Sequence, residues 1–481
     1  MGLLGSSKRL RQEIETLRRQ LEEAIASNEA LRGDNEALRG DNEALKKKIA
    51  ELEELLTQER RAGRRQAAPF RRRQRTSEPK KPGRKAGHPG ARRSTPERFD
   101  RTLQAAPLVG CPHCAGPLSD IKELENYQTE LPPIKAEVAR ILFQSGWCET
   151  CQKRVYSTHE EQSSTATGAA GHHLGPRLRA FTADLKGRLG IPFRKIQDIL
   201  RVQFDLEVSA GGLVQSNHHL AQRATATVQA MKQELGQENV VHADETGWRV
   251  AAENAWLWVI CSSRFTIYEI TSHRCATVVG EVLGEGFAGF LMRDGWSSYD
   301  ARLAYRMLRC LLHLKRNAVE LEETQVGEAV ETPALFALWL DGVFLLKSRW
   351  GELSEQAYAR EATELVEYFD ELVQWHDPDK RNQAFVERLA QAREHLVPIL
   401  EHPELPATNN LAERQIRPGV VHRKLSAGNK SEKGAKTTAA LASLTATCHQ
   451  QAIPFAKVAY CLLIGPAGQP VRFWQPEPAP S

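Results

Sequence analysis

Three acidic side chains stand where they could hold a metal ion together. The stretch "NVVHADETGWRV" is an apolar run that ends on Asp244 and Glu245, just before a Thr-Gly turn. The stretch "GFAGFLMRDGWSSYD" is typical of another strand, and it ends on Asp294 before a glycine. Further along, "ATNNLAERQIRPGVVHRK" is typical of a helix, and it carries Glu413. Carboxylates that end adjacent strands, joined by a third from a helix, form an oxygen cage suited to Mg²⁺.

The chemistry of such a cage is phosphoryl transfer. Two Mg²⁺ ions, which Mn²⁺ can replace, activate a nucleophilic oxygen and stabilise the leaving oxygen of an in-line attack on phosphate. A hydroxide or a DNA 3′-OH is the expected nucleophile, so no covalent protein intermediate is required. The alternative is that Asp244 and Asp294 are turn residues, because Asp before Gly is ordinary turn chemistry.

The elements that must position these carboxylates follow from the pattern around them. The runs "NAWLWVICSS" and "FTIYEITSH" are apolar and β-rich, and turn signals separate them, so we expect a strand, a hairpin and a further strand. A long, mostly helical stretch is expected from Met307 to about Leu396. We therefore expect a sheet that holds the two aspartates and a helical segment before Glu413.

The bulk composition limits the class of protein. A chain of 481 residues is too long for one ordinary core, so three or four folding units are expected. A hydrophobic content of 41% suits a soluble protein, and no run is apolar and long enough to cross a membrane. The start lacks a signal-peptide core, and nine cysteines in such a chain favour metal sites or free thiols over disulfides. We expect a cytoplasmic protein without a membrane partner.

Two CxxC pairs predict a structural zinc site. The pairs are Cys111-Pro-His-Cys114 and Cys148-Glu-Thr-Cys151, and the strand-like run "AEVARILFQSGW" lies between them. Each pair can place two sulfurs on one cation, and four thiolates complete a tetrahedral Zn²⁺ shell in a ribbon. Four buried free thiols are the alternative, although such thiols rarely produce two CxxC pairs.

A heptad pattern predicts that the chain assembles through its N-terminal segment. From Leu10 to Leu56 every d position except Ala24 is Leu, and Asn28, Asn35 and Asn42 occupy a positions. Leu at d with Asn at a favours a parallel two-stranded coiled coil, because paired Asn side chains bond only in that register. We expect a homodimer or a higher oligomer; the alternative is a single solvated helix.

The excess positive charge lies in residues 60–98. This segment holds 15 Lys and Arg against two acids and carries +13, whereas the whole chain carries +5 and the remainder −8. It is rich in Arg, Pro and Gly and cannot bury enough apolar surface to fold alone. We interpret it as a basic arm on DNA phosphates, with a solvated linker as the alternative. Its expected contacts are Arg84, Lys85, Arg92 and Arg93.

A helix-turn-helix pattern follows the cysteine region. The helical run "PFRKIQDILRVQF" is followed by a short turn, and Ser209 is a suitable N-cap for "AGGLVQSNHHLAQRA". In a DNA-binding unit of this kind Gln215, Asn217 and His218 would face DNA. Many helical hairpins bind nothing, so a plain structural hairpin is the alternative.

Several motifs, in order, resemble the transposase of the bacterial insertion sequence 66 family. They are "HADETGWRV…AWLWV", "RDGWSSYD", "CLLHLKR" and "NNLAERQIRP", and the zipper-like helix, basic arm and CxxC pairs also match. The resemblance implies an RNase H-like catalytic domain with an Asp-Asp-Glu triad at Asp244, Asp294 and Glu413. Consecutive strand residues point to opposite faces, so only one of Asp244 and Glu245 can face the metal, and the resemblance selects Asp244. It also implies an α-helical insertion within the 119 residues that separate Asp294 from Glu413.

Other residues near these motifs are candidates for accessory roles. His242 shares a strand face with Asp244, and Cys310 and His313 share a helical face, where packing against the sheet is favoured over metal binding. Basic residues on and after the Glu413 helix are candidates for phosphate contacts, with salt bridges to nearby acids as the alternative. These basic residues are Arg414, Arg417, Arg423 and Lys424.

We therefore predict a multidomain α+β chain. Its expected parts are a coiled coil (1–58), a basic linker (59–104), a four-Cys zinc domain (105–160), a helix-turn-helix region (161–234), an RNase H-like domain in two parts (235–319 and 404–465) around a helical insertion (320–403), and a tail (466–481). The expected function is a nucleoid-associated bacterial DNA transposase that binds element ends, frees 3′-OH ends and joins them to target DNA, with small accessory proteins of the same element as further partners. The alternatives are a domesticated, non-catalytic DNA-binding regulator and a metal-dependent nuclease without strand transfer.

Overall fold

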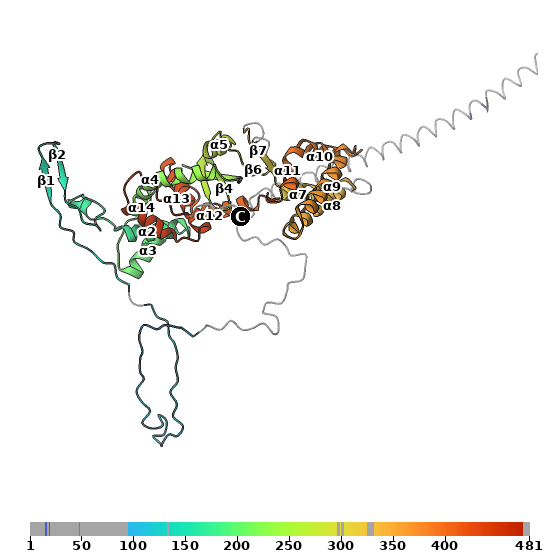
Figure 1. Ribbon diagram of the computed structural model, residues 1–481. Coiled ribbons are helices and arrows are strands. Elements are labelled where there is room, and N and C mark those ends of the chain that lie inside the picture. The colour runs from blue at the N-terminus through green and yellow to red at the C-terminus, as the bar shows by residue number, and fades with distance from the viewer. Residues whose placement is uncertain are drawn as a thin grey trace, which may run out of the picture. The chain divides into compact units, whose positions relative to one another are not determined.

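The structure is a computed structural model that describes residues 95–131, 134–295, 299, 303–324 and 331–474, together with residues 15, 16, 19 and 48 (Figure 1). The chain divides into two compact units, Met1–Ser94 and Thr95–Ser481. Arg84, Lys85, Arg92 and Arg93 lie outside the described residues, as does almost all of the predicted coiled coil. In the described part, no helix has both the length and the apolar character that a membrane span requires.

A five-stranded mixed sheet forms the centre of the second unit. Its strands are β3 (Val240–Val250), β4 (Glu253–Cys261), β5 (Thr266–Thr271), β6 (Phe290–Arg293) and β7 (Arg306–Arg309). They lie in the order β5-β4-β3-β6-β7, so β3, the first of these five strands in the sequence, occupies the middle of the sheet. The pairs β3–β4 and β4–β5 are antiparallel, which confirms the expected hairpins, whereas β3–β6 and β6–β7 are parallel.

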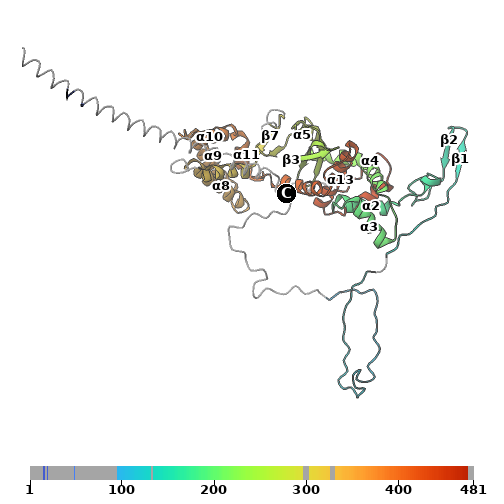
Figure 2. The ribbon, with the colours of Figure 1, turned by 180° about the vertical axis from the view of Figure 1, so that it is seen from behind.

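Helices cover both faces of this sheet (Figure 1 and Figure 2). The covering helices are α4 (Ala210–Leu235), α5 (Thr277–Leu283), α12 (Asn410–Ser426), α13 (Glu432–Gln450) and α14 (Phe455–Ile464). Val241 and Ala243 of β3 form one core with side chains of α4 and α14, whereas Trp248 and Val250 of β3 form another with α12. This division follows from the alternation of side chains along a strand, and it puts α12 on the face that carries the even-numbered residues of β3.

A helical subdomain follows β7, and its core also includes side chains of β6 and β7. Its helices are α7 (Leu311–Thr324), α8 (Glu331–Ser348), α9 (Glu355–Gln374), α10 (Lys380–Gln391) and α11 (Arg393–Glu401), with a 3₁₀ turn at Trp350–Glu352. Phe336 stacks on Trp339, and Trp339 in turn contacts Phe369. Helices therefore occupy the stretch 320–403, where the insertion was expected. The mostly helical stretch was expected to start at Met307, which is wrong, because Met307 lies in β7, where it is buried and pairs with Leu291 of β6.

The region of the predicted helix-turn-helix is helical, and side chains of its helices form a small core of their own that includes Leu185, Ile196, Leu200 and Leu213. Helices α2 (Pro176–Gly187) and α3 (Phe193–Phe204) precede α4, and a 3₁₀ turn spans Gly168–Gly171. Ser209 caps α4, as expected, because its Oγ accepts a hydrogen bond from the Gly212 N–H. Helix α4 continues for 26 residues, and its side chains join the core of the central sheet.

The cysteine region contains a two-stranded antiparallel hairpin. Strand β1 (Ser145–Cys148) pairs with β2 (Lys153–Tyr156), and both appear together in Figure 1. The run "AEVARILFQSGW" was expected to be strand-like, but only its last residues, from Ser145 on, belong to a strand. The residues before Ser145 have no ladder partner within the described residues, and side chains such as Val138 and Leu142 are exposed.

Candidate active site

Two aspartates occupy equivalent heights on neighbouring parallel strands. Strands β3 and β6 pair in the register Val240↔Phe290 and His242↔Met292, a constant offset along the two strands. Asp244 and Asp294 each lie two residues beyond the last pair, so the same offset relates them. Since side chains alternate, both belong to the face of His242 and Met292. Neighbouring strands lie about 4.8 Å apart, and the charge of Asp294 is near enough to Asp244 to raise its pKa.

Asn409 joins the helix that carries Glu413 to this part of the sheet. It is the N-cap residue of α12 and is 1% exposed. Its Nδ2 donates a hydrogen bond to the Ala243 carbonyl (2.8 Å), and its Oδ1 lies 3.0 Å from Nδ1 of His242. Its backbone N–H donates to Sγ of Cys310 at 3.1 Å. Four residues later Glu413 stands in the first turn of α12, on the same side of the sheet as the aspartates.

Two further contacts hold α12 along its length. The Tyr268 hydroxyl of β5 donates a hydrogen bond to the Gln415 carbonyl. Nearer the helix end, Arg423 donates through Nη1 to the Gly247 carbonyl of β3. Arg423 is thus partly buried and anchors the helix, and burial lowers its pKa. Its proposed contact with DNA would compete with this anchoring role.

His242 is a neutral imidazole inside the protein. Burial lowers its pKa to about 4, and the positive charge of Arg414 lowers it further, although the hydrogen bond with Asn409 opposes these effects. Because Asn409 uses its Nδ2 to donate to Ala243, its Oδ1 must be the acceptor, and we assign the ring hydrogen of His242 to Nδ1. The lone pair of Nε2 is then left on the other side of the ring.

Burial and the negative charges of neighbouring carboxylates raise the pKa of Asp244. Burial is the main cause that raises its pKa to about 7, and the charge of Glu245 is the next. Asp294 and Glu413 raise this pKa as well, whereas a hydrogen bond from the Glu245 N–H to Asp244 Oδ1 (2.9 Å) opposes the rise. Asp294 and Glu413 therefore each lie close enough to Asp244 to repel its negative charge. A divalent cation would relieve this repulsion.

Glu245, the rival of Asp244, is committed to the other face of β3. Its side chain is 1% exposed, and its Oε1 accepts two hydrogen bonds from Arg274, at 2.9 and 2.6 Å. Its Oε2 accepts a third from the Tyr299 hydroxyl at 2.9 Å. With these partners the Glu245 carboxylate is satisfied inside the protein, which leaves Asp244 as the carboxylate of this pair on the α12 face.

The donor set fits a divalent cation by its chemistry but is not closed around one position. Carboxylate oxygens are the preferred ligands of Mg²⁺ and Mn²⁺. In the described residues, however, no three His, Cys, Asp or Glu side chains lie near enough to share one ion. The Glu413 side chain is 41% exposed on its helix, so rotation about its own bonds can bring its oxygens nearer the aspartates. The carboxylate oxygens are the type of ligand that the ion prefers, and a shared site would require the side chains to move closer together.

Cys310 and His313 lie near the start of the Glu413 helix, at the start of the helical subdomain. Cys310 is fully buried, burial raises its pKa, and it packs below Asn409 as a thiol, in agreement with the expected packing role. His313 is partly exposed, and its Nε2 lies 3.9 Å from Oε1 of Glu413. Its Nδ1 is buried without a hydrogen-bond partner in the described part of the chain. The imidazole of His313 therefore faces the third carboxylate.

The expected DNA contacts differ in their accessibility. Arg414, Arg417 and Lys424 are exposed on α12, and Arg414 is near enough to lower the pKa of His242. On α4, Gln215 is exposed, but Asn217 is only 4% exposed. The expectation that Asn217 faces DNA is corrected by this burial inside the helical packing around α4.

His218, the third residue expected to face DNA on α4, is half-buried. Its Nδ1 is 2.7 Å from the Thr437 hydroxyl of α13, so part of its ring is engaged inside the protein.

Each CxxC pair forms a tight turn. The Ala115 N–H donates to the Cys111 carbonyl at 2.8 Å, whereas Cys148 ends β1 and Cys151 stands in the turn that leads to β2. Hydrogen bonds lower the pKa of Cys111 and of Cys148, the largest from the backbone at His113 and at Cys151 respectively. A lowered pKa favours the thiolate that binds zinc. The described residues do not bring three of these sulfurs together, so the shared four-thiolate site stays a prediction.

Comparison with known proteins covers the region that carries the carboxylates. The sequence model of the transposase IS66 family matches residues 171–437, which include all five strands of the central sheet. The chain is also similar to the uncharacterized protein y4qI of Sinorhizobium fredii, with 26% identity over 308 residues. That alignment covers 58% of this chain and 57% of the relative, so the chain spans little more than half of the relative's length.

The Asn409 contacts predict a sharp difference between two adjacent asparagines. Asn409→Ala would leave the Ala243 carbonyl and the His242 ring N–H buried without partners, each at a cost of about 1–3 kcal/mol. We expect the variant to be destabilised by about 2–4 kcal/mol in chemical denaturation, with faster amide exchange in α12. The neighbouring Asn410 is exposed, and Asn410→Ala is the matched control. Equal behaviour of the two variants would show that Asn409 does not hold the helix.

The raised pKa of Asp244 predicts a pH-dependent stability in the presence of a chelator. Since the folded pKa, about 7, lies above the ordinary 3.8, folding favours the protonated carboxyl. This contribution is complete below about pH 4 and is lost as the pH rises through 7. Asp244→Asn should therefore match the wild type near pH 4 and exceed its stability at pH 8 by on the order of a few kcal/mol. The exposed Asp341→Asn should show no such gain, and a similar gain there would contradict the assignment to Asp244.

Proposed function

Because the chain belongs to the transposase IS66 family, we propose that it is a DNA transposase that cleaves DNA at element ends and transfers the freed 3′-OH ends to target DNA. The observation that supports this proposal is electrostatic: Asp294 and Glu413 both raise the pKa of Asp244. Asp244 is on β3, Asp294 directly follows the neighbouring parallel strand β6, and Glu413 is on α12. Asp244, Asp294 and Glu413 would hold two Mg²⁺ or Mn²⁺ ions, which activate the attacking oxygen and stabilise the leaving oxygen of a phosphodiester.

The protein's own groups prepare this reaction. Asn409 fixes the first turn of α12, which carries Glu413, against β3. His242 stays neutral, so it adds no positive charge that would compete with a cation for Asp244. The exposed guanidinium groups of Arg414 and Arg417 are on the Glu413 helix and are suited to orient the phosphates next to the scissile bond.

The fold that we propose for residues 235–319 and 404–465 is RNase H-like. Three features support the proposal: the first aspartate is on the central strand, the second follows the adjacent parallel strand, and the glutamate is on a helix against the same face. The helices from α8 to α11 lie between the second aspartate and the glutamate in the sequence, where the helical insertion was expected.

The remaining parts of the chain fit a role in assembling two DNA ends. We propose that the N-terminal coiled coil pairs subunits, and that the basic arm, the CxxC pairs with Zn²⁺ and the α3–α4 hairpin bind the element ends. The lowered pKa values of Cys111 and Cys148 support the zinc proposal. In this proposal duplex DNA is the principal partner, the nucleoid is the site of action, and accessory proteins of the same element are further partners.

Single substitutions of the three carboxylates test the proposal. Asp244→Ala, Asp294→Ala and Glu413→Ala should each lower Mg²⁺-dependent cleavage of labelled end DNA by about 100-fold or more, because the charge that stabilises the transition state is lost. Binding of the same DNA in a gel-shift assay should stay unchanged. Glu394→Ala is the matched control, since this carboxylate is 80% exposed in the helical subdomain.

The products distinguish the alternatives in the same assay when target plasmid is added. Joined products that disappear in all three variants would support the transposase. Cleavage without joining would assign a nuclease, and binding without either product would assign a non-catalytic regulator. Near-normal activity of any one variant would remove that position from the triad.

A further inference from the structure

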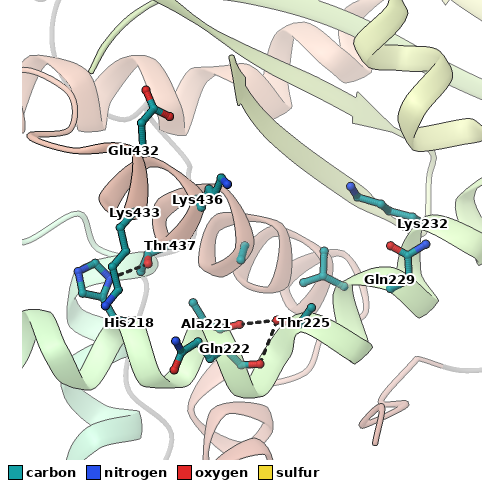
Figure 3. A pocket seen from close by; sticks show the side chains of 12 residues that line it. His218, Ala221, Gln222, Thr225, Gln229, Lys232, Glu432, Lys433, Lys436 and Thr437 are labelled. Atoms are coloured by element: carbon teal, nitrogen blue, oxygen red, sulfur yellow. Dashed lines mark hydrogen bonds between the residues drawn. The ribbon is translucent and has the colours of Figure 1, made fainter. Parts of the chain in front are cut away.

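A groove of about 540 Å³ lies between α4 and α13, and none of its lining residues belongs to the helix that carries Glu413 (Figure 3). Its α4 wall carries the polar side chains of His218, Gln222, Thr225, Gln229 and Lys232 beside the apolar Ala221 and Val228. The polar residues recur every three or four positions, so they share one face of the helix. At 1.5 Å per residue this row of residues is about 21 Å long, the axial length of about six base pairs of duplex DNA.

The α13 wall supplies the positive charge. Lys433 and Lys436 are both exposed and one helical turn apart, and among the described residues neither has an ion-pair partner. Lys433 lies close enough to His218 to lower its pKa, although burial is the larger cause. Glu432 also lines the groove, but Figure 3 shows its carboxylate directed away from α4.

Helix geometry adds to this positive wall. The groove opens at the first turns of α13, which starts at Glu432 after the N-cap Ser431 and runs for 19 residues. The N-terminus of a helix carries a partial positive charge. Lys433, Lys436 and the helix N-terminus thus concentrate positive charge at one end of the groove. At the other end Lys232 pairs with Glu269 of the edge strand β5 at 2.6 Å, so most of its charge is compensated.

We propose that the α4–α13 groove binds the phosphate backbone of duplex DNA, a surface separate from the carboxylate site. The inference rests on the proposed function and extends it. Lysine, amide and hydroxyl side chains with a helix N-terminus are the groups that contact DNA phosphates without reading bases. The open, elongated form suits a polymer backbone. In this arrangement the groove holds DNA outside the reacting position, and its lysines govern affinity but not sequence preference.

A paired substitution tests the groove in the full-length protein. We compare Lys433→Ala/Lys436→Ala with Lys380→Ala/Lys457→Ala, a control pair of exposed lysines on α10 and α14. The probe is a fluorescein-labelled, mixed-sequence duplex, and binding is followed by anisotropy over a series of salt concentrations. The groove variant should bind about tenfold more weakly or worse, and the slope of log K against log salt should become shallower by about two. The control pair should behave as the wild type.

A change of opposite sign makes the test independent of damage to the fold. Glu432→Lys should tighten duplex binding and steepen the salt dependence, which a misfolded variant would not do. Unchanged affinity and slope in the groove variant, with normal binding by the wild type, would overturn the groove and leave the proposed function intact. No duplex binding by the wild type would instead contradict the proposed function. Polyglutamate serves as a second probe, which stands in for an acidic protein segment. If the groove variant loses binding to polyglutamate but keeps its DNA binding, the groove binds an acidic protein segment and the proposal is overturned.

Discussion

The candidate site depends on one buried side chain, Asn409. Its amide joins the start of α12 to the Ala243 carbonyl and to the ring of His242, and its backbone N–H joins the same point to Cys310. Three segments that are distant in the sequence thus meet at one residue: the central strand, the start of the helical subdomain and the Glu413 helix. A buried amide must be hydrogen-bonded to be tolerated, so the site cannot loosen at this point without an energetic cost. The position of Glu413 is a consequence of this requirement.

The same region stores electrostatic repulsion. Burial disfavours the ionised form of Asp244 most strongly, and the charges of Asp294 and Glu413 add to this effect. Such an arrangement opposes folding and is typical of functional sites, because unfavourable charge is there compensated by a ligand. On the other face of β3, Glu245 accepts hydrogen bonds from Arg274 and Tyr299. The strand therefore separates a carboxylate held by two side chains, which has a structural role, from Asp244, which accepts a backbone hydrogen bond and can bind a cation.

Much of this arrangement could be predicted from the sequence, and the failures have physical causes. The strand end just before Asp294 could be predicted because the apolar run stops there, and the Ser209 cap because its chemistry is local. The expected strand end at Asp244 and the Thr-Gly turn after it are wrong, because β3 continues to Val250 and pairs with β4 along that length. The role of Asn409 could not be predicted, since it stands beside another asparagine and only the packing of α12 shows which of the two is buried. Asn217 was misjudged because its burial comes from tertiary packing around α4, which the local helical pattern does not reveal. Met307 was placed in a helix because β7 is only four residues long and gains its stability from pairing with β6.

The most direct test is where a divalent cation binds in crystals of the full-length protein. Crystals grown with Mn²⁺ and measured at an anomalous wavelength locate the ion independently of activity. The account predicts an anomalous peak bounded by carboxylate oxygens of Asp244, Asp294 and Glu413 at about 2.0–2.3 Å, with the Asn409 contacts to β3 preserved. A strong peak elsewhere and none between these side chains, or a Glu413 that remains turned away in the loaded crystal, would contradict it.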